Sequence, residues 1–148
     1  MMSWAFVLVV ALGSHPGGTF ESSRECGECH AEIYSADWGG SMHAQSYSDP
    51  LFQEQFKDVS KPEERRICLG CHAPLAIYDR DPELKKATTR EGVGCDFCHS
   101  VSALLPISFD QPLRFVLSPG EIKRGPFAAS DLAEKGHKNE RSPLFRDS

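Results

Sequence analysis

One pentapeptide pattern, Cys-x-x-Cys-His, occurs three times and uses every cysteine of the 148-residue chain. The copies are CGECH at residues 26–30, CLGCH at 68–72 and CDFCH at 95–99. They are spaced unevenly along the chain, so they are not units of a regular solenoid repeat. Any fold of this chain must therefore accommodate three equivalent sets of two thiols and one imidazole.

Disulfide bonds are the first interpretation of these cysteines. A disulfide between residues three apart closes a very short loop, so it constrains the unfolded chain little. It also gives no role to the histidine that follows each pair. Disulfides between different motifs stay open as an alternative, but they leave the three histidines unexplained.

Metal sites built from cysteine are the second interpretation. Two Cys-x-x-Cys pairs complete a tetrahedral zinc site, which leaves the third pair over. A histidine directly after the second cysteine is not the usual spacing of zinc ligands. Iron–sulfur proteins also space their cysteines differently.

Covalent haem attachment explains all three residues that the copies of the pattern share, which are the two cysteines and the histidine. The two thiols add to the vinyl groups of haem as thioethers, and the following histidine binds the iron as its proximal ligand. We therefore predict three covalently bound c-type haems. The predicted attachment residues are Cys26, Cys29, Cys68, Cys71, Cys95 and Cys98, and the predicted proximal ligands are His30, His72 and His99.

Three further histidines are candidates for the second axial position, which is usually filled by His or Met. His43 follows the first motif by thirteen residues, beyond a helix-like segment and a Gly-Gly turn. It is the predicted distal ligand, with the neighbouring Met42 as the alternative. His137 is the second candidate, although its polar surroundings also suit a surface histidine. His15 is the poorest candidate, so one iron is expected to be open or to take a ligand from another chain.

The charge and the N-terminal residues bear on partners and location. The net charge is −5, which argues against nucleic acid as a partner. Residues 4–12 form an apolar run that is too short to span a bilayer as a helix, with small residues just after it. This pattern predicts a signal peptide at 1–13, a flexible leader at 14–23 and a periplasmic or otherwise exported protein. An uncleaved leader would instead associate the protein with a membrane.

The remaining chain, 24–148, is expected to be one domain that is mainly α-helical with much irregular loop. Helices are predicted at 25–38, 49–59 and 62–73, and a short strand at 113–117. Three macrocycles in so short a chain must form much of its apolar core. The cations Arg114, Lys123 and Arg124 are candidates for pairing with haem propionates, with plain surface charge as the alternative.

Three segments resemble a known family: ECGECHAEIYSADWGGSMHAQS, CLGCHAPLA and EGVGCDFCHSV. They are similar to the multihaem cytochrome c family that includes the tetrahaem cytochrome c of nitrifying bacteria. That family is related to hydroxylamine oxidoreductase and octahaem tetrathionate reductase. The resemblance covers residues 24–148 and implies a compact multihaem cytochrome c fold.

The resemblance also bears on the distal ligands and on the C-terminus. It implies that His43, in the SMHA segment, is a distal haem ligand, and that His137, after RGPF, has the same role. Family members continue from a segment like SPLFRDS into a further haem motif. We therefore expect this chain to be a C-terminally truncated member, or a fragment of a larger multihaem assembly.

Two functions follow as expectations. The first is a three-haem electron carrier that passes electrons between redox partner proteins. The second is a haem enzyme, or a fragment of one, whose open iron acts on a small nitrogen or sulfur compound. Carbon monoxide binds only to an open or weakly held iron, so no binding by the reduced protein favours the carrier. Binding would mean either an enzyme or a site that a missing C-terminal part normally closes.

Overall fold

The computed structural model describes residues 19–105, 115–128 and 136–144. The helical elements are α1 (Ser23–Gly27), the π-helix η1 (Ile33–Trp38), α2 (Met42–Gln45), α3 (Pro50–Lys57), α4 (Pro62–His72), α5 (Leu75–Tyr78), the 3₁₀ helix η2 (Thr88–Arg90) and α6 (Cys95–His99). They are followed by the strands β1 (Val101–Leu104), β2 (Phe115–Leu117), β3 (Ile122–Gly125) and β4 (Lys138–Arg141). The fold is therefore mainly α with much irregular loop, as predicted.

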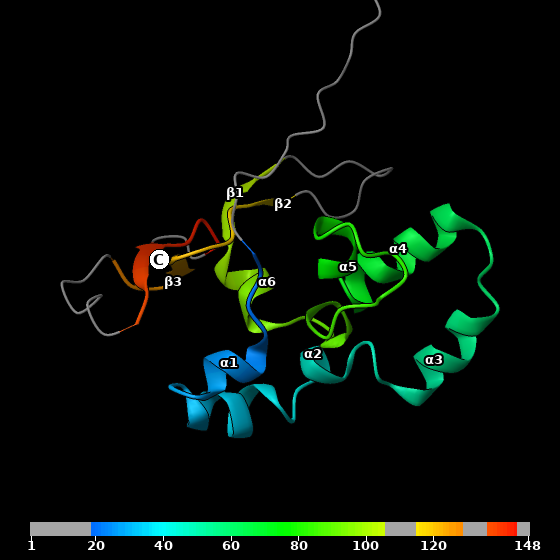
Figure 1. Cartoon of the computed structure of the whole chain (residues 1–148), viewed down its shortest axis with the longest axis horizontal. Coiled ribbons are helices and arrows are strands. Elements are labelled where there is room, and N and C mark those ends of the chain that lie inside the picture. Colours follow the sequence, from blue (N-terminus) through cyan, green and yellow to red (C-terminus); the bar gives the residue numbers. More distant parts are fainter. Residues whose placement is uncertain (1–18, 106–114, 129–135, 145–148) are drawn as a thin grey trace, which may run out of the picture.

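The elements lie in two groups around α2 (Figure 1). Helices α3, α4 and α5 form one side of the molecule, and α1, α6 and the strands form the other. The strands make two small sheets. β1 pairs antiparallel with β2, and β3 pairs parallel with β4, with Ile122 opposite Lys138. The strand predicted at 113–117 is confirmed over 115–117, and its first two residues lie outside the described part.

Two of the predicted helices begin at proline, for local reasons that the sequence contains. Asp49 caps α3 by accepting a hydrogen bond of 2.9 Å from the backbone N–H of Phe52, and Pro50 fits the first turn. Pro62 opens α4, and two glutamates follow it in the first turn, where the helix dipole favours negative charge. The predictions at 49–59 and 62–73 are confirmed within one or two residues at each end.

The single helix predicted at 25–38 is wrong in part. α1 ends at Gly27, and the chain turns before it continues as the π-helix η1. The turn is tight, because a Cβ added to Gly27 would lie 2.7 Å from Cγ of Tyr34. The rings of Tyr34 and Trp38 stack with centroids 5.4 Å apart. η1 closes where the N–H of Gly39 donates to the carbonyl of Tyr34 at 2.8 Å, so the predicted Gly-Gly end is confirmed.

Two clusters of buried side chains form the core. One contains Phe52, Phe56, Leu69, Ala73, Ala76 and Leu84, and the other contains Leu75, Phe97, Val101 and Leu117. The short helix α5 contributes Leu75 to one cluster and Ala76 to the other, so it joins the two sides of the molecule.

Within the described ranges, no helix has the length and apolar character needed to cross a membrane. The predicted signal peptide at 1–13 and most of the leader at 14–23 lie outside these ranges.

Candidate functional site

Two of the three Cys-x-x-Cys-His motifs lie in helices: the second ends α4, and the third is the whole of α6. Residues three and four apart share one face of a helix, so the two thiols and the imidazole of these motifs lie on a common face. The first motif runs from the end of α1 into the following turn, where the N–H of His30 donates to the carbonyl of Cys26 at 2.9 Å. None of the six cysteines, all of which lie in the described residues, forms a disulfide.

The histidine of the second motif is oriented by a backbone carbonyl. Nδ1 of His72 lies 2.6 Å from the carbonyl oxygen of Ser46, and its ring stacks on Phe52 with centroids 3.8 Å apart. A carbonyl only accepts hydrogen bonds, so Nδ1 carries the proton and donates. The lone pair of a neutral ring is then on Nε2, where a metal ligand needs it.

The third motif repeats this arrangement with different residues. Nδ1 of His99 donates to the carbonyl oxygen of Arg124, on β3, at 2.7 Å. Nε2 of His99 is again the nitrogen left with a lone pair. Two proximal candidates from unrelated parts of the chain thus have the tautomer and the oriented ring that iron ligation requires.

The first motif is paired with the C-terminal histidine. The rings of His30 and His137 have centroids 6.1 Å apart and planes inclined by 39°. Imidazole nitrogens bind first-row metals at about 2 Å, so two imidazoles on one metal have ring centres about 6 Å apart. The spacing of this pair is compatible with axial ligands of one iron.

His43 lies on α2 with an exposed side chain. Its carbonyl oxygen accepts from the backbone N–H of Val93 at 2.9 Å, next to the third motif. The hydroxyl of Ser46, on the following turn, is 3.0 Å from the carbonyl oxygen of His72. α2 is therefore held between the second and third motifs, and the described residues show no ring contact between His43 and a proximal candidate.

The first and third motifs meet at their first cysteines. The thiols of Cys26 and Cys95 are neighbours. Their interaction, helped by the hydroxyl of Ser23, lowers the pKa of the Cys95 thiol to about 6 despite its burial. The same contact, together with burial, raises the pKa of Cys26. Both effects apply to the free thiols, because a thioether has no proton to lose.

Further bonds hold the two motifs together. The hydroxyl of Ser23 accepts from the backbone N–H of Cys95 at 3.0 Å, and the N–H of Ser23 donates to Glu91 at 2.7 Å. On η1, Nε1 of Trp38 donates to the carbonyl of Val93 at 2.9 Å. The first and third haem motifs are thus fixed relative to each other.

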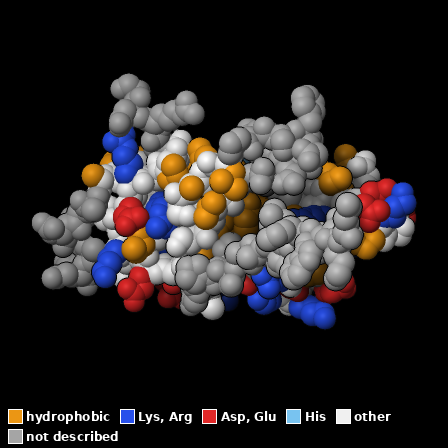
Figure 2. Space-filling model, turned by 90° about the horizontal axis from the view of Figure 1, so that it is seen from above, with side chains coloured by type: hydrophobic (Ala, Val, Ile, Leu, Met, Phe, Trp, Pro, Cys, Tyr) orange, Lys and Arg blue, Asp and Glu red, His pale blue; other side chains and the backbone are white. Residues whose placement is uncertain are grey.

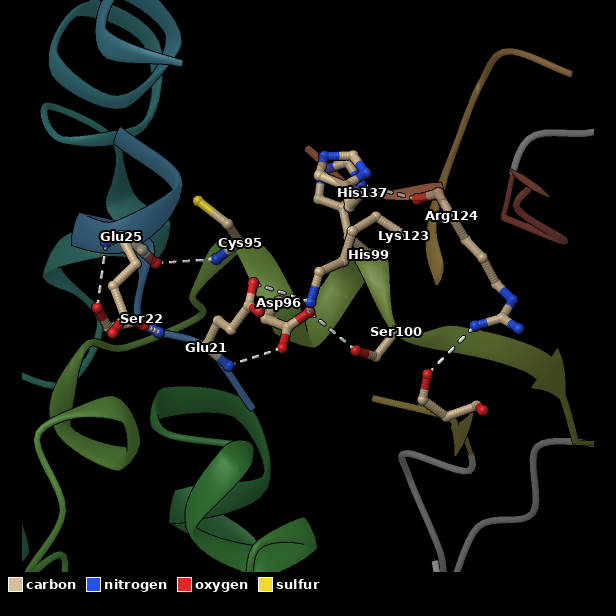
Figure 3. Close-up of polar contacts among 12 residues, drawn as sticks. Glu21, Ser22, Glu25, Cys95, Asp96, His99, Ser100, Lys123, Arg124 and His137 are labelled. Carbon is tan, nitrogen blue, oxygen red and sulfur yellow. Dashed lines mark hydrogen bonds and ion pairs between the residues drawn. The ribbon is translucent and has the colours of Figure 1, made fainter. Parts of the chain in front are cut away.

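A buried carboxylate lies inside the third motif (Figure 3). Asp96 accepts hydrogen bonds from the backbone N–H of Glu21 and the hydroxyl of Ser100, and its Oδ1 lies 2.8 Å from Nζ of Lys123. Burial disfavours the charged form of Lys123, but the bonds and charges of Asp96 and Glu21 outweigh it. The pKa of Lys123 is therefore above its usual value.

Two of the three cations considered for haem propionates are bound by protein carboxylates, and Arg114 lies outside the described residues. Lys123 pairs with Asp96 and Glu21, and a guanidinium nitrogen of Arg124 lies 3.2 Å from Glu140. In the described residues, these two side chains serve ion pairs within the protein.

Large apolar side chains are exposed close to the candidate ligands. Ile33, Met42 and Ile67 are 55%, 76% and 64% exposed, and they adjoin the first motif, His43 and the second motif. Seen from the side on which β1 and β2 lie, hydrophobic side chains gather near the middle of the face, and charged groups lie toward its ends (Figure 2). Exposed apolar side chains that lie close in sequence to the candidate ligands suit a large apolar macrocycle such as haem.

The described residues of different motifs do not come together as the ligands of one metal ion. Among the residues that the structure describes, no group of three or more His, Cys, Asp or Glu side chains is placed to hold a metal ion. Two cysteine pairs forming a zinc site would need such a group.

Comparison with known proteins agrees with the haem interpretation. The family model described as cytochrome c554 and c-prime matches residues 25–100, more than half of the chain. The chain belongs to the cytochrome c554 and c-prime family. The matched range contains all three Cys-x-x-Cys-His motifs and His43.

A solved structure extends the likeness beyond that range. The penta-heme cytochrome c552 from Thermochromatium tepidum matches this member of the cytochrome c554 and c-prime family with a TM-score of 0.63 and 27% sequence identity. The match covers 84% of this chain and 42% of the other, so the chain spans less than half the length of that cytochrome. No curated protein gives a significant match.

Sequence reasoning did not anticipate the groups that orient the candidate ligands. The acceptors for His72 and His99 are backbone carbonyls, 26 and 25 residues away along the chain. A carbonyl has no sequence signature, so only the fold identifies it. Asp96 did carry a signal, because an acid between the two cysteines of a motif needs a partner if it is buried.

Proposed function

We propose that the chain is an exported multihaem cytochrome with three covalently bound c-type haems, which transfers electrons between redox partner proteins. The observation that carries the proposal is the state of His72 and His99. In both, a backbone carbonyl holds the Nδ1 proton and leaves Nε2 for a metal. A surface histidine has no need of this arrangement.

In this proposal the six motif cysteines hold the haems as thioethers, and His30, His72 and His99 are their proximal ligands. Bound haem supplies reversible one-electron chemistry at iron. The protein residues hold the rings, fix the ligand tautomers and exclude water with apolar side chains such as Ile33 and Ile67. No side chain is required to make or break a bond of a substrate.

The contact between Cys26 and Cys95 supports a close pair of haems. These two sulfurs would anchor different macrocycles, and as thiols they are neighbours that shift each other's pKa. The haems that they carry would therefore lie next to each other, which favours rapid electron exchange between them. The second motif connects to this pair through α2, by the bonds of Ser46 to His72.

The distal ligands follow from the same geometry. We assign His137 to the iron of the first motif, because its ring faces His30 at 6.1 Å. His43 is the proposed distal ligand of a further haem, with Met42 as the alternative. One iron is then left for a ligand from outside the described residues.

The cellular setting belongs to the proposal as well. Residues 1–13 are the proposed signal peptide, 14–23 a leader and 24–148 the haem domain, in the periplasm or an equivalent exported compartment. The partners are redox proteins, and a larger multihaem assembly is consistent with the 42% coverage of the pentahaem chain.

Mass spectrometry tests the haem content. The chain is produced in a host that matures c-type haems, and replacement of both cysteines in one motif by alanine is the matched control. We expect the mass of three haems in the parent protein and of two in each control. A parent protein without covalently bound haem would refute the proposal.

Carbon monoxide distinguishes the carrier from the enzyme. The difference spectrum of the dithionite-reduced protein is recorded with and without the gas. A spectrum that does not change supports the carrier, because each iron then keeps two firm ligands. A clear shift shows an open or weakly held iron, so either the chain turns over a small nitrogen or sulfur compound, or a ligand from outside the described residues normally closes that site.

A further inference from the structure

We propose that the buried ion pair of Asp96 and Lys123 positions the proximal ligand of the third haem, by holding β3 where its backbone can accept the hydrogen bond of His99. The inference rests on the proposed function, because it takes His99 as an iron ligand. It assigns positioning roles to two residues that touch neither the iron nor the thioethers.

Asp96 fixes the α6 side of this contact. It is 1% exposed and lies between the two cysteines of the third motif. Its carboxylate accepts from the N–H of Glu21 at 2.8 Å and from the hydroxyl of Ser100 at 3.0 Å. A buried carboxylate with these partners is an immobile anchor within the five-residue helix that carries His99.

Lys123 fixes the β3 side. Its side chain is 8% exposed, and its ammonium reaches Oδ1 of Asp96 at 2.8 Å and Glu21 at 3.2 Å. The next residue, Arg124, supplies the carbonyl that accepts from Nδ1 of His99 at 2.7 Å. The ion pair and the histidine bond therefore connect the same two elements through neighbouring positions of one strand.

The position of β3 along α6 couples the ion pair of Lys123 with Asp96 to the hydrogen bond of His99 with Arg124. Consecutive Cα atoms are about 3.8 Å apart, so a slip of β3 by one residue carries the Arg124 carbonyl out of hydrogen-bond range of His99. The ion pair resists that slip, because separating a buried ammonium from a buried carboxylate leaves both unpaired. The opposite edge of β3 is held by Ser142, whose N–H donates to Gly125 at 2.8 Å.

The expected consequence is electronic. A carbonyl bonded to Nδ1–H fixes the ring and increases the electron donation from Nε2 to a bound metal. Stronger donation favours ferric over ferrous iron, so it lowers the reduction potential of that haem. Loss of the ion pair should weaken the bond and raise the potential of the third haem.

The test uses the double variant Asp96→Asn/Lys123→Met in the haem-loaded protein. It removes one negative and one positive charge, so the net charge is unchanged and no buried charge is left unpaired. NMR measures solvent exchange of the His99 ring N–H, and a redox titration measures the potential of the third haem. The third haem is identified as the component missing from Cys95→Ala/Cys98→Ala. His72 is an internal reference, because its ring N–H donates to a different element.

We expect the His99 ring N–H to exchange about tenfold faster in the double variant, as for loss of one hydrogen bond, and the third potential to rise. The matched control is Asp79→Asn/Lys86→Met, which removes an exposed ion pair with N–O distance 2.6 Å. It should change neither quantity. The single variant Lys123→Arg keeps the positive charge and a hydrogen-bond donor. Exchange of the His99 ring N–H in this variant should therefore stay within about twofold of the parent protein.

Other outcomes overturn the inference. A double variant that holds three haems with parental exchange and potential shows that the ion pair does not position His99. If the double variant fails to mature, Lys123→Gln is measured instead, and parental values there have the same meaning. Failure of the proposed function is distinct, since the parent protein would then lack haem at the third motif by mass.

Discussion

His137 is the residue whose role depends most on the fold, since its partner His30 is far away in sequence. Their rings lie 6.1 Å apart. We expect His137→Ala to open one iron, so that the reduced protein binds carbon monoxide where the parent protein does not or binds more of it. The optical difference spectrum measures this.

His15→Ala is the control for this substitution, because His15 is the poorest of the ligand candidates. It should leave the spectrum unchanged. A His137→Ala protein with the parental spectrum would mean that His30 and His137 do not share an iron.

Gly27, between the two cysteines of the first motif, is constrained by an aromatic ring. An added Cβ would lie 2.7 Å from Cγ and 2.8 Å from Cδ1 of Tyr34. We expect Gly27→Ala to reduce the free energy of unfolding by about 1–3 kcal/mol through overpacking. Denaturant titration of the haem-loaded protein measures it.

Gly40→Ala is the matched substitution for comparison, because nothing lies within 4 Å of a Cβ there. Its effect should stay within about 0.5 kcal/mol. Equal effects of the two alanines would contradict the packing of Tyr34 on the first motif.

At the scale of elements, the loop between α5 and η2 depends on one carboxylate. Oδ2 of Asp81 accepts from the backbone N–H of Lys86 at 2.9 Å and from the hydroxyl of Thr89 at 2.7 Å. These bonds, led by the one from Lys86, outweigh burial and lower the pKa of Asp81 below 3.8. Its stabilising effect is therefore present above that pH and is lost as the pH falls through the lowered pKa.

Asp81→Asn should reduce the free energy of unfolding by about 1–3 kcal/mol at neutral pH. The difference from the parent protein should shrink below the ordinary carboxyl pKa of 3.8, where the parent loses the same contribution. Denaturant titrations across this pH range measure it. Asp79→Asn, which removes an exposed ion pair with Lys86, should cost less than about 1 kcal/mol. A pH-independent difference for Asp81→Asn would contradict the assignment.

The elements differ in how well the sequence predicts them, for physical reasons. α3 and α4 are set by local signals, the Asp-Pro and Pro-Glu-Glu starts. The break between α1 and η1 is not local, because it depends on Tyr34 packing against Gly27 and on Trp38 bonding to Val93, 55 residues away.

Some residues of the candidate site can be predicted from the sequence, and others cannot. The thiols and the candidate proximal histidines can be predicted, because haem attachment requires a fixed spacing between them. The acceptors of Nδ1, at Ser46 and Arg124, are not visible, because any residue has a carbonyl. The meeting of His30 with His137 is also a product of the fold, although a count of spare histidines does mark His137 as a candidate.

At the scale of the whole molecule, the two apolar clusters are small and large apolar side chains flank the motifs. Burial of so little apolar surface offsets the conformational entropy of the chain poorly. We expect the chain produced without haem to be largely unfolded, and the haem-loaded chain to be helical. Far-UV circular dichroism measures the difference. Native-like helicity in the haem-free chain would show that the macrocycles are not a main part of the core.

The meeting of Cys26 and Cys95 has a consequence for the order of biosynthesis. The thiols of these two proposed haem-attachment residues are neighbours, and their contact lowers the pKa of the Cys95 thiol to about 6, which makes it the more reactive of the two. In an oxidising compartment, exchange with another protein's disulfide would join the two sulfurs, and that disulfide would take their two electrons and their protons and become two thiols. That crosslink would block both attachment sites at once. Both sites therefore stay free for haem while the first and third motifs are apart, as we expect in the unfolded haem-free chain, or after a reductant has reopened the disulfide.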